Sequence, residues 1–279
     1  MSPTPSLLAL TATSAALLAS ALWLASEPLR TALRRRRIRT RPFPASWRRV
    51  LQQKMPAWRA LPPDLQDRLR RLIQIFIAEK RFTGCDGMVV TDEVRLLIAA
   101  QACLLILRRP LDDFAGVREI LVYPGAFAVS RRETDHSGVE HAWQRVHLGE
   151  SSSRGQVVLA WDAVLAGAAD ASDGHNVVIH EFAHQLDQQN GAANGAPPLP
   201  GRARVARWAA VMGAAYTLLH QQVAAQEMPV LDSYGAHSPA EFFAVATESF
   251  FERPQHLALA LPEAYAELSA YYRVDPRLW

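Results

Sequence analysis

The 279-residue sequence predicts an α+β fold, on three observations. Apolar residues recur at helical spacing before residue 110, short β-branched runs follow between residues 120 and 161, and helical patterns return from residue 176. Helices followed by a small sheet and then by further helices are typical of an α+β domain. A hydrophobic fraction of 49% with 20% charged residues is sufficient for a sizeable core.

The chain begins with an apolar segment. Residues Leu7 to Ala25 are interrupted only by Thr and Ser, and the stretch is just long enough to span a bilayer. A cleaved secretory signal carries its positive charge before the apolar region, whereas here Arg34 to Arg37 follow it. We therefore expect residues 1–29 to be an inner-membrane anchor with the body on the cytoplasmic face. The alternative is an Ala/Leu-rich helix lying on the protein itself or on the membrane surface, with the protein otherwise cytoplasmic.

The distribution of charge argues against nucleic acid as a partner. The net charge is +3, but 11 Lys or Arg lie between Arg30 and Arg59 without any acid. After Arg59, the remaining 19 basic residues face 26 acidic ones, so the body carries a net charge of −7. A basic leader on an acidic body favours a local role for the leader over DNA binding.

Residues 30–46 are predicted to form a basic linker, because Pro42 and Pro44 each remove an amide donor and favour extended predecessors. The folded domain is expected at 47–279, with a helical part to about residue 110 and a second part from about 111 to 279. A first helix is predicted from the Pro62-Pro63-Asp64 start to about Glu79, and a second from Thr91 to Arg108.

The change of pattern after residue 110 predicts strands and then new helices. The strands are expected at Ile120–Tyr123, Phe127–Val129 and Val157–Trp161, which are short and bounded by Gly, Pro, Ser and charge. A helix is expected from Asn176 to Gln189, opened by a turn at Asp173-Gly174 and closed by Asn190-Gly191.

That helix carries the motif His180-Glu181-Phe182-Ala183-His184. Residues four apart lie on one helix face, so both imidazoles can reach one ion, and Glu181 lies beside them to accept a proton from water. This arrangement is typical of zinc peptidases, in which Zn²⁺ activates water for attack on a peptide carbonyl. The alternative is a pair of core histidines with Glu181 merely exposed.

A catalytic zinc needs a third protein ligand and an open position. No third histidine follows at short spacing, and the helix opened by Ser238-Pro239 carries Glu241 and Glu248 seven residues apart on one face, so either can ligate. Tyr234 precedes that helix as a candidate donor to a developing oxyanion or as a structural tyrosine. Asp187 can hold a ligand by a hydrogen bond or be a solvated residue at the helix end.

Several sequence segments longer than the five-residue motif resemble a known protein family. They extend from Asp173 to Asp187 and from Ser238 to Val245, with further matches at Ala78–Phe82, Ala99–Cys103, Val122–Pro124 and Gly149-Glu150. Over roughly Arg41 to the C-terminus, the sequence resembles the Mlc titration factor A family of bacterial zinc peptidases.

The resemblance implies a fold, an activity and a set of site residues. The expected fold is a zincin-like metallopeptidase domain similar to the catalytic domain of anthrax lethal factor, and the expected activity is aminopeptidase-like cleavage of short peptides. The implied ligands of Zn²⁺ are His180, His184 and Glu241, with Glu181 as the catalytic carboxylate and Glu248 behind the ligands. The resemblance also suggests a role for Tyr234 near the reacting carbonyl and for His141, which matches a histidine proposed to approach the metal in the resting enzyme.

A binding function is the alternative. Family members can capture the glucose repressor Mlc, so the protein can instead be a regulatory binding protein for a transcriptional repressor of the Mlc type. Glu181 favours catalysis, because a structural zinc site needs no carboxylate at that position and is more often closed by four protein ligands. An intramembrane protease is disfavoured, because polar residues flank the motif far from the apolar segment.

Overall fold

The computed structural model describes Ser20, Trp23 and residues 26–134, 140–152 and 155–279, with the backbone alone for 128–134, 140–147 and 152. The chain divides into two compact units, Met1–Pro42 and Phe43–Trp279. Apart from Ser20 and Trp23, the apolar segment from Leu7 to Ala25 lies outside the described residues. Within the described part of the chain, no helix is both long enough and apolar enough to cross a membrane.

The first unit contains helix α2 (Glu27–Arg39). Pro28 lies at the start of α2, where a helix has no use for the amide hydrogen that proline lacks. The arginines Arg34 to Arg37 therefore lie on a helix within the segment predicted as a linker, whereas residues 41–44 are not helical.

The second unit begins with the helices α3 (Ala45–Lys54), α4 (Pro56–Ala60) and α5 (Pro63–Glu79), and helix α6 (Asp92–Leu104) follows the first strand. Helix α5 has the bounds that its apolar spacing predicts. Helix α6 is capped by Thr91, whose side chain accepts a hydrogen bond from the amide of Val94. It ends four residues earlier than predicted, because the chain passes into tight turns from Leu105 towards Pro110.

The main sheet has four strands, which are β1 (Arg81–Gly84), β2 (Glu119–Tyr123), β5 (Gly149–Ser152) and β6 (Gln156–Ala160). Their spatial order is β1-β2-β6-β5, with β1, β2 and β6 parallel and β5 antiparallel to β6. A separate antiparallel pair consists of β3 (Phe127–Thr134) and β4 (Glu140–His147). Among the described strands, β5 is therefore an edge of the main sheet.

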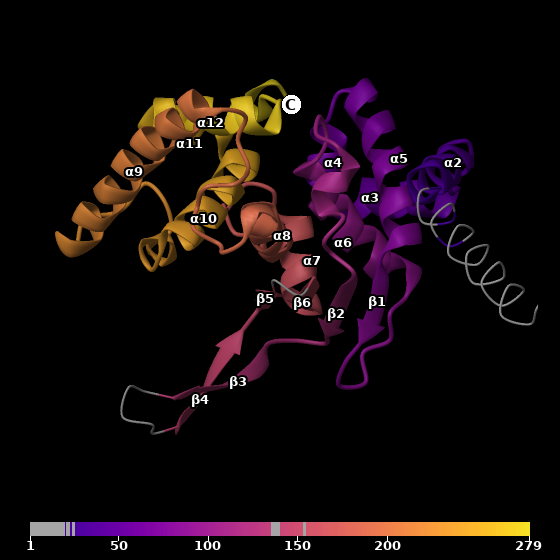
Figure 1. The fold of residues 1–279 in the computed structure, drawn as a ribbon, viewed down its shortest axis with the longest axis horizontal. Helices are drawn as coiled ribbons and strands as arrows, with labels where there is room; N and C mark the ends of the chain where they lie inside the picture. The colour runs from indigo at the N-terminus through magenta and orange to yellow at the C-terminus, as the bar shows by residue number, and fades with distance from the viewer. Residues whose placement is uncertain (1–19, 21–22, 24–25, 135–139, 153–154) are drawn as a thin grey trace, which may run out of the picture. The chain divides into compact units, whose positions relative to one another are not determined.

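The C-terminal half is helical, with α7 (Trp161–Ala169), α8 (Val177–Asp187), α9 (Arg202–Ala224), α10 (Pro239–Glu252), α11 (Pro254–Ala260) and α12 (Pro262–Tyr272). Short 3₁₀ turns lie at Leu111–Phe114, Gln188–Asn190, Ser233–Ala236 and Pro276–Leu278. Figure 1 shows α8 between the α3–α6 helices and the α9–α12 helices. The observed fold is α+β, as predicted, and it is mostly helical with a small mixed sheet.

Candidate metal centre

Helix α8 is fixed at its N-terminus and along its apolar face. The side chain of Asn176 accepts a hydrogen bond from the amide of Ile179 (3.0 Å), which satisfies an amide that the helix itself leaves unpaired. Phe182 is fully buried, with its ring centroid 4.9 Å from that of Phe114 and 5.6 Å from that of Phe76. The buried aromatic contacts set the rotation of α8, and this rotation brings His180 and His184 towards α10.

Helix α10 supplies the third donor. Ser238 caps it by accepting a hydrogen bond from the amide of Glu241 (3.2 Å), and Pro239 occupies its first position. Phe243 and Ala244 are fully buried, which holds the next turn of α10 in the core. Glu241 consequently extends from the first turn of α10 towards the two histidines of α8.

Three donor atoms converge between α8 and α10. The Nε2 atoms of His180 and His184 are 3.2 Å apart, and Oε2 of Glu241 lies 2.9 Å from the first and 3.3 Å from the second. A divalent ion bound tetrahedrally at about 2.1 Å needs donor atoms about 3.4 Å apart. The observed spacing is a few tenths of an ångström tighter, so a small adjustment of side chains admits an ion. The three residues therefore fit a metal site with one position left open.

The electrostatics of these donors suit a cation. Burial alone raises the pKa of Glu241, but hydrogen bonds with His180 and His184 hold it well below the ordinary value. Burial lowers the pKa of His180, and its contacts with Glu241 and Glu248 outweigh burial and raise it. Without an ion, positive charge on the His180 imidazole offsets the neighbouring carboxylates, and a bound cation would replace that charge.

Glu248 lies behind the donors and orients one of them. Its Oε1 is 2.8 Å from Nδ1 of His180, and its Oε2 accepts a hydrogen bond from the amide of Asn176 (2.5 Å). The Nδ1–H of His180 therefore points at a fixed carboxylate, which leaves Nε2 free of hydrogen for a metal. Although Glu241 and Glu248 lie on the same helix face, they contact different nitrogens of the His180 ring, Glu241 at Nε2 and Glu248 at Nδ1.

A buried polar network extends from Glu248 into the core. The Nδ2 of Asn176 donates to Oε1 of Gln101 (2.9 Å), to the carbonyl of Gly167 (3.1 Å) and to Oε1 of Glu252 (2.9 Å). Burial raises the pKa of Glu252 to about 9, so this carboxyl is neutral at physiological pH. A neutral Glu252 avoids a second buried negative charge beside Glu248.

Glu181 lies against the edge strand β5. Its side chain is buried, and the space that it occupies exists because residue 149 is glycine. A Cβ atom on Gly149 would lie 2.4 Å from Oε1 of Glu181, which is far inside van der Waals contact. Burial raises the pKa of Glu181 to about 7, and the neighbouring His180 and His184 oppose that rise.

These side chains line one cleft. Its volume is about 610 Å³, and its walls include Gly149, His180, Glu181, Tyr234 and Glu248. Tyr234 lies in the 3₁₀ turn Ser233–Ala236, is 46% exposed and has its ring centroid 5.9 Å from that of His180. The structure therefore brings Tyr234 to the cleft wall beside a metal donor.

Asp187 and His141 are the remaining residues that the sequence singled out. Asp187 is fully buried, and its Oδ2 accepts a hydrogen bond from the amide of Gly195 (2.7 Å), so it is not a solvated residue at the helix end. His141 lies on β4 opposite Glu133, and its side chain is outside the described part of the structure. Among the side chains that are described, the metal-ligating group comprises His180, His184 and Glu241.

The sequence indicated no role for Gly149 or Gln101. It indicated Asn176 only as the start of a helix. A glycine that begins a strand, and a polar residue within an apolar helix, are the signals that these positions carry. Neither signal identifies the partner, because Gly149 and Glu181 meet only through the packing of β5 against α8.

Comparisons with known proteins agree with this geometry. The family model of the glucose-regulated metallopeptidase M90 matches residues 29–273. The chain is 41% identical over 244 residues to a Synechocystis protein that is named only as uncharacterized, covering 87% of this chain and 89% of the relative. It is 36% identical over 225 residues to Mlc titration factor A of Edwardsiella ictaluri (80% and 85% covered). It is 34% identical over 235 residues to the same-named protein of Serratia proteamaculans (83% and 88% covered). The chain therefore belongs to the M90 family of metallopeptidases, together with the Mlc titration factor A proteins.

Proposed function

We propose that the protein is a zinc-dependent peptidase of the aminopeptidase type, in which His180, His184 and Glu241 hold the metal. The observation that carries the proposal is the convergence of three donor atoms at near-tetrahedral spacing, with a buried carboxylate beside them. Nitrogen and oxygen donors in a four-coordinate arrangement with one open position are typical of catalytic zinc. When bound, zinc supplies a Lewis acid that lowers the pKa of water and polarises a carbonyl group.

Glu181 acts as the general base in this proposal. Its carboxylate accepts a proton from the attacking water and later donates that proton to the nitrogen of the leaving amine, so the two transfers balance. A pKa of about 7 suits a group that must both accept and release a proton near neutral pH. The enclosure of Glu181 by β5 limits its movement and exposure, which favours a fixed direction of transfer.

Two further features support substrate binding in the cleft. Strand β5 is an edge of the main sheet, and an extended peptide can pair with the outer side of such a strand. The phenol of Tyr234 is proposed to donate a hydrogen bond to the oxyanion that develops on the peptide carbonyl. His141 is proposed as an additional ligand that would leave when substrate enters. A zincin-like fold, similar to that of the anthrax lethal factor catalytic domain, is also part of the proposal.

Glu181→Gln is the decisive variant. The full-length protein, loaded with zinc, is tested with amino-acid anilides and N-blocked peptides side by side, and its metal content is measured. We expect cleavage of the anilides by the wild type, at least about 10³-fold lower turnover for Glu181→Gln, and unchanged metal content in both. Glu263→Gln, at an exposed position on α12, is the matched control. Equal turnover of Glu181→Gln and the wild type would refute the mechanism, and cleavage of blocked peptides alone would exclude aminopeptidase action.

A regulatory binding function is the second candidate, because relatives at 36% and 34% identity bear the name Mlc titration factor A. In this alternative, the protein captures a transcriptional repressor and the metal is structural. Co-purification of an Mlc-type repressor with Glu181→Gln, together with no peptide cleavage by the wild type, is the result that selects it.

The apolar segment at residues 7–25 is proposed to anchor the protein at the cytoplasmic face of the inner membrane. Its composition and the arginines that follow it support this proposal. Recovery of the full-length protein in the soluble fraction, without detergent or carbonate, would exclude the anchor.

A further inference from the structure

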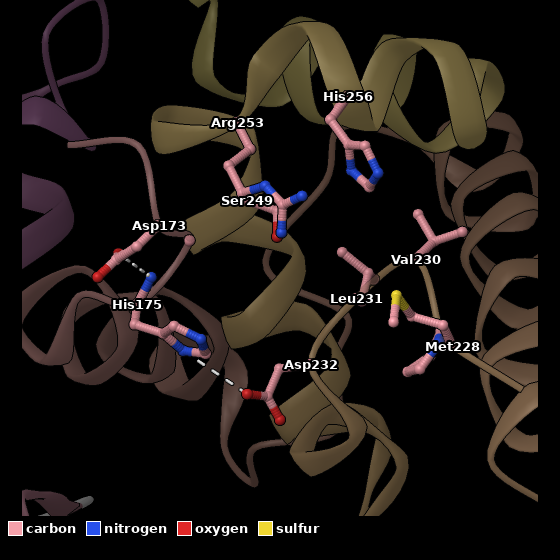
Figure 2. Close-up of a pocket in the computed structure, with 11 residues that line it drawn as sticks. Asp173, His175, Met228, Val230, Leu231, Asp232, Ser249, Arg253 and His256 are labelled. Atoms are coloured by element: carbon pink, nitrogen blue, oxygen red, sulfur yellow. Dashed lines mark hydrogen bonds and ion pairs between the residues drawn. The ribbon is translucent and has the colours of Figure 1, made fainter. Parts of the chain in front are cut away.

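A second cavity adjoins the cleft. Its volume is about 420 Å³, and it lies between the end of α10, the start of α11 and the segment Met228–Asp232 (Figure 2). It shares Asp173, His175 and Asp232 with the cleft that His180 and Glu181 line. Nδ1 of His175 lies 3.6 Å from Oδ2 of Asp232, so this pair marks the boundary between the two spaces. The two spaces therefore share a wall.

Arg253 is the distinctive residue of this cavity. It follows the last residue of α10, is half-buried, and among the described residues its guanidinium has no ion pair or hydrogen bond. Its aliphatic stem packs against Gly174, where an added Cβ would lie 2.9 Å from Cδ of Arg253. Gly174 also has a φ of +85°, a conformation that favours glycine, and the absence of a Cβ there leaves room for the stem of Arg253.

The cavity has a cationic end. Figure 2 shows Arg253 and His256, three residues apart, entering from one end, with Asp232 at the other. The carboxylates of Asp173 and Asp232 also line the cavity. Each accepts a hydrogen bond from a backbone amide, that of His175 (2.8 Å) and that of Tyr234 (2.7 Å), and neither forms an ion pair with Arg253 among the described contacts. A half-buried guanidinium without a counter-ion favours an anion, and its planar fork matches a carboxylate.

We propose that the Arg253 cavity is a substrate carboxylate subsite, which binds the C-terminal carboxylate of a short peptide or an acidic side chain of a longer one. The inference rests on the proposed peptidase function. Glu241 and Arg253 are about 18 Å apart along α10, and Glu248, beside His180, is about 7.5 Å from Arg253, at 1.5 Å per residue. An extended peptide advances about 3.4 Å per residue, so the carboxylate lies roughly two to five residues from the scissile bond. The protein would therefore select short anionic peptides.

The test compares tetrapeptides of one sequence that end in a free carboxylate, in an amide, or in a glutamate that is itself amidated. An amino-acid anilide normalises each preparation for active enzyme. For the wild type, we expect kcat/KM for the free acid to exceed that for the plain amide at least about 10-fold, mainly through KM, because a hydrogen bond to a charged group is lost. In Arg253→Gln that ratio falls to about one. Arg202→Gln, which removes the same charge from an exposed position outside the cavity, keeps the wild-type ratio.

The outcomes distinguish a C-terminal carboxylate from an acidic side chain. They also distinguish failure of the subsite from failure of the peptidase function. Preference for the free acid alone assigns the subsite to the C-terminus, and equal preference for the amidated glutamate assigns it to acidic groups in general. Equal kcat/KM for all three peptides in the wild type overturns the subsite. If no substrate is cleaved, the peptidase function fails, and the subsite is then tested by calorimetric binding of the free-acid and amide peptides to Glu181→Gln. Equal affinities there overturn the subsite as well.

Discussion

Gly149 limits the position of Glu181. Replacement of Gly149 by alanine places a methyl group where Oε1 of Glu181 now lies, so the carboxylate must rotate away. We expect Gly149→Ala to lower kcat about 10²-fold, the typical effect of a displacement of about 1 Å of a catalytic group. The steady-state kinetics of anilide hydrolysis measure this effect.

The metal content of Gly149→Ala serves as the control, because the clash involves Glu181 and none of the three metal donors. Zinc content equal to that of the wild type, with a lower kcat, supports the geometry. A wild-type kcat would show that Glu181 does not act from the position described.

The stability of the folded protein is expected to depend on pH through Glu252. Burial raises its pKa from the ordinary 4.5 to about 9, so the folded protein binds a proton that the unfolded chain releases above pH 4.5. The contribution to stability is fully present below about pH 4.5 and is lost as the pH rises through about 9. Between pH 6 and 9 we expect the free energy of unfolding to fall by up to about 1.4 kcal/mol per pH unit.

Glu252→Gln removes this proton and keeps the acceptor for Asn176. Denaturant unfolding of the variant is expected to depend less on pH over the same range, while Glu263→Gln behaves as the wild type. Parallel pH profiles of the wild type and Glu252→Gln would contradict a neutral Glu252.

At the scale of elements, the site joins two helices that are distant in sequence. Helix α8 supplies two donors and α10 supplies one, so a bound ion crosslinks them. An ion present at 1,000 times its dissociation constant stabilises the folded state by about 4 kcal/mol. We expect chelation to lower the thermal midpoint by several degrees, as followed by circular dichroism. His184→Ala should abolish the difference between chelated and zinc-loaded samples, and a full difference in this variant would place the ion elsewhere.

Helices with clear apolar spacing and capping residues could be predicted from the sequence. Short strands that form only by pairing with neighbouring strands could not. Apolar residues at helical spacing predict α5, α8 and α10, and the capping residues Asn176 and Ser238 mark the starts of α8 and α10. Strands β1 and β5 are four residues long and carry polar or small residues, so only their neighbours in the sheet make them strands. Periodicity alone left the choice between Glu241 and Glu248 open, because it places both on one face. The resemblance implied Glu241, and in the structure the two carboxylates lie against opposite nitrogens of His180.

At the scale of the whole molecule, the division at Pro42 predicts that the second unit folds alone. A chain that begins at Phe43 retains the core residues of α3 to α12 and the complete donor set. We expect this truncated protein to unfold within a few degrees of the full-length protein and to hydrolyse anilides at a similar kcat. Thermal unfolding and kinetics on both proteins test the division, and insoluble or inactive truncated protein would contradict it.

Pro42 and Pro44 led to the expectation that the folded domain begins at residue 47, and the second compact unit begins at Phe43. The sequence did not indicate that the arginines before this point form α2, since charge alone favours no secondary structure. The separate β3–β4 pair was also beyond prediction, because nothing local distinguishes two strands that pair with each other from strands that join the main sheet.

The two histidines of the site differ in how firmly their rings are held. Nδ1 of His180 lies against Glu248, whereas Nδ1 of His184 is buried and has no hydrogen-bond partner among the described residues. A ring held at only one nitrogen turns more easily. We therefore expect that His184 would hold a bound metal less firmly than His180.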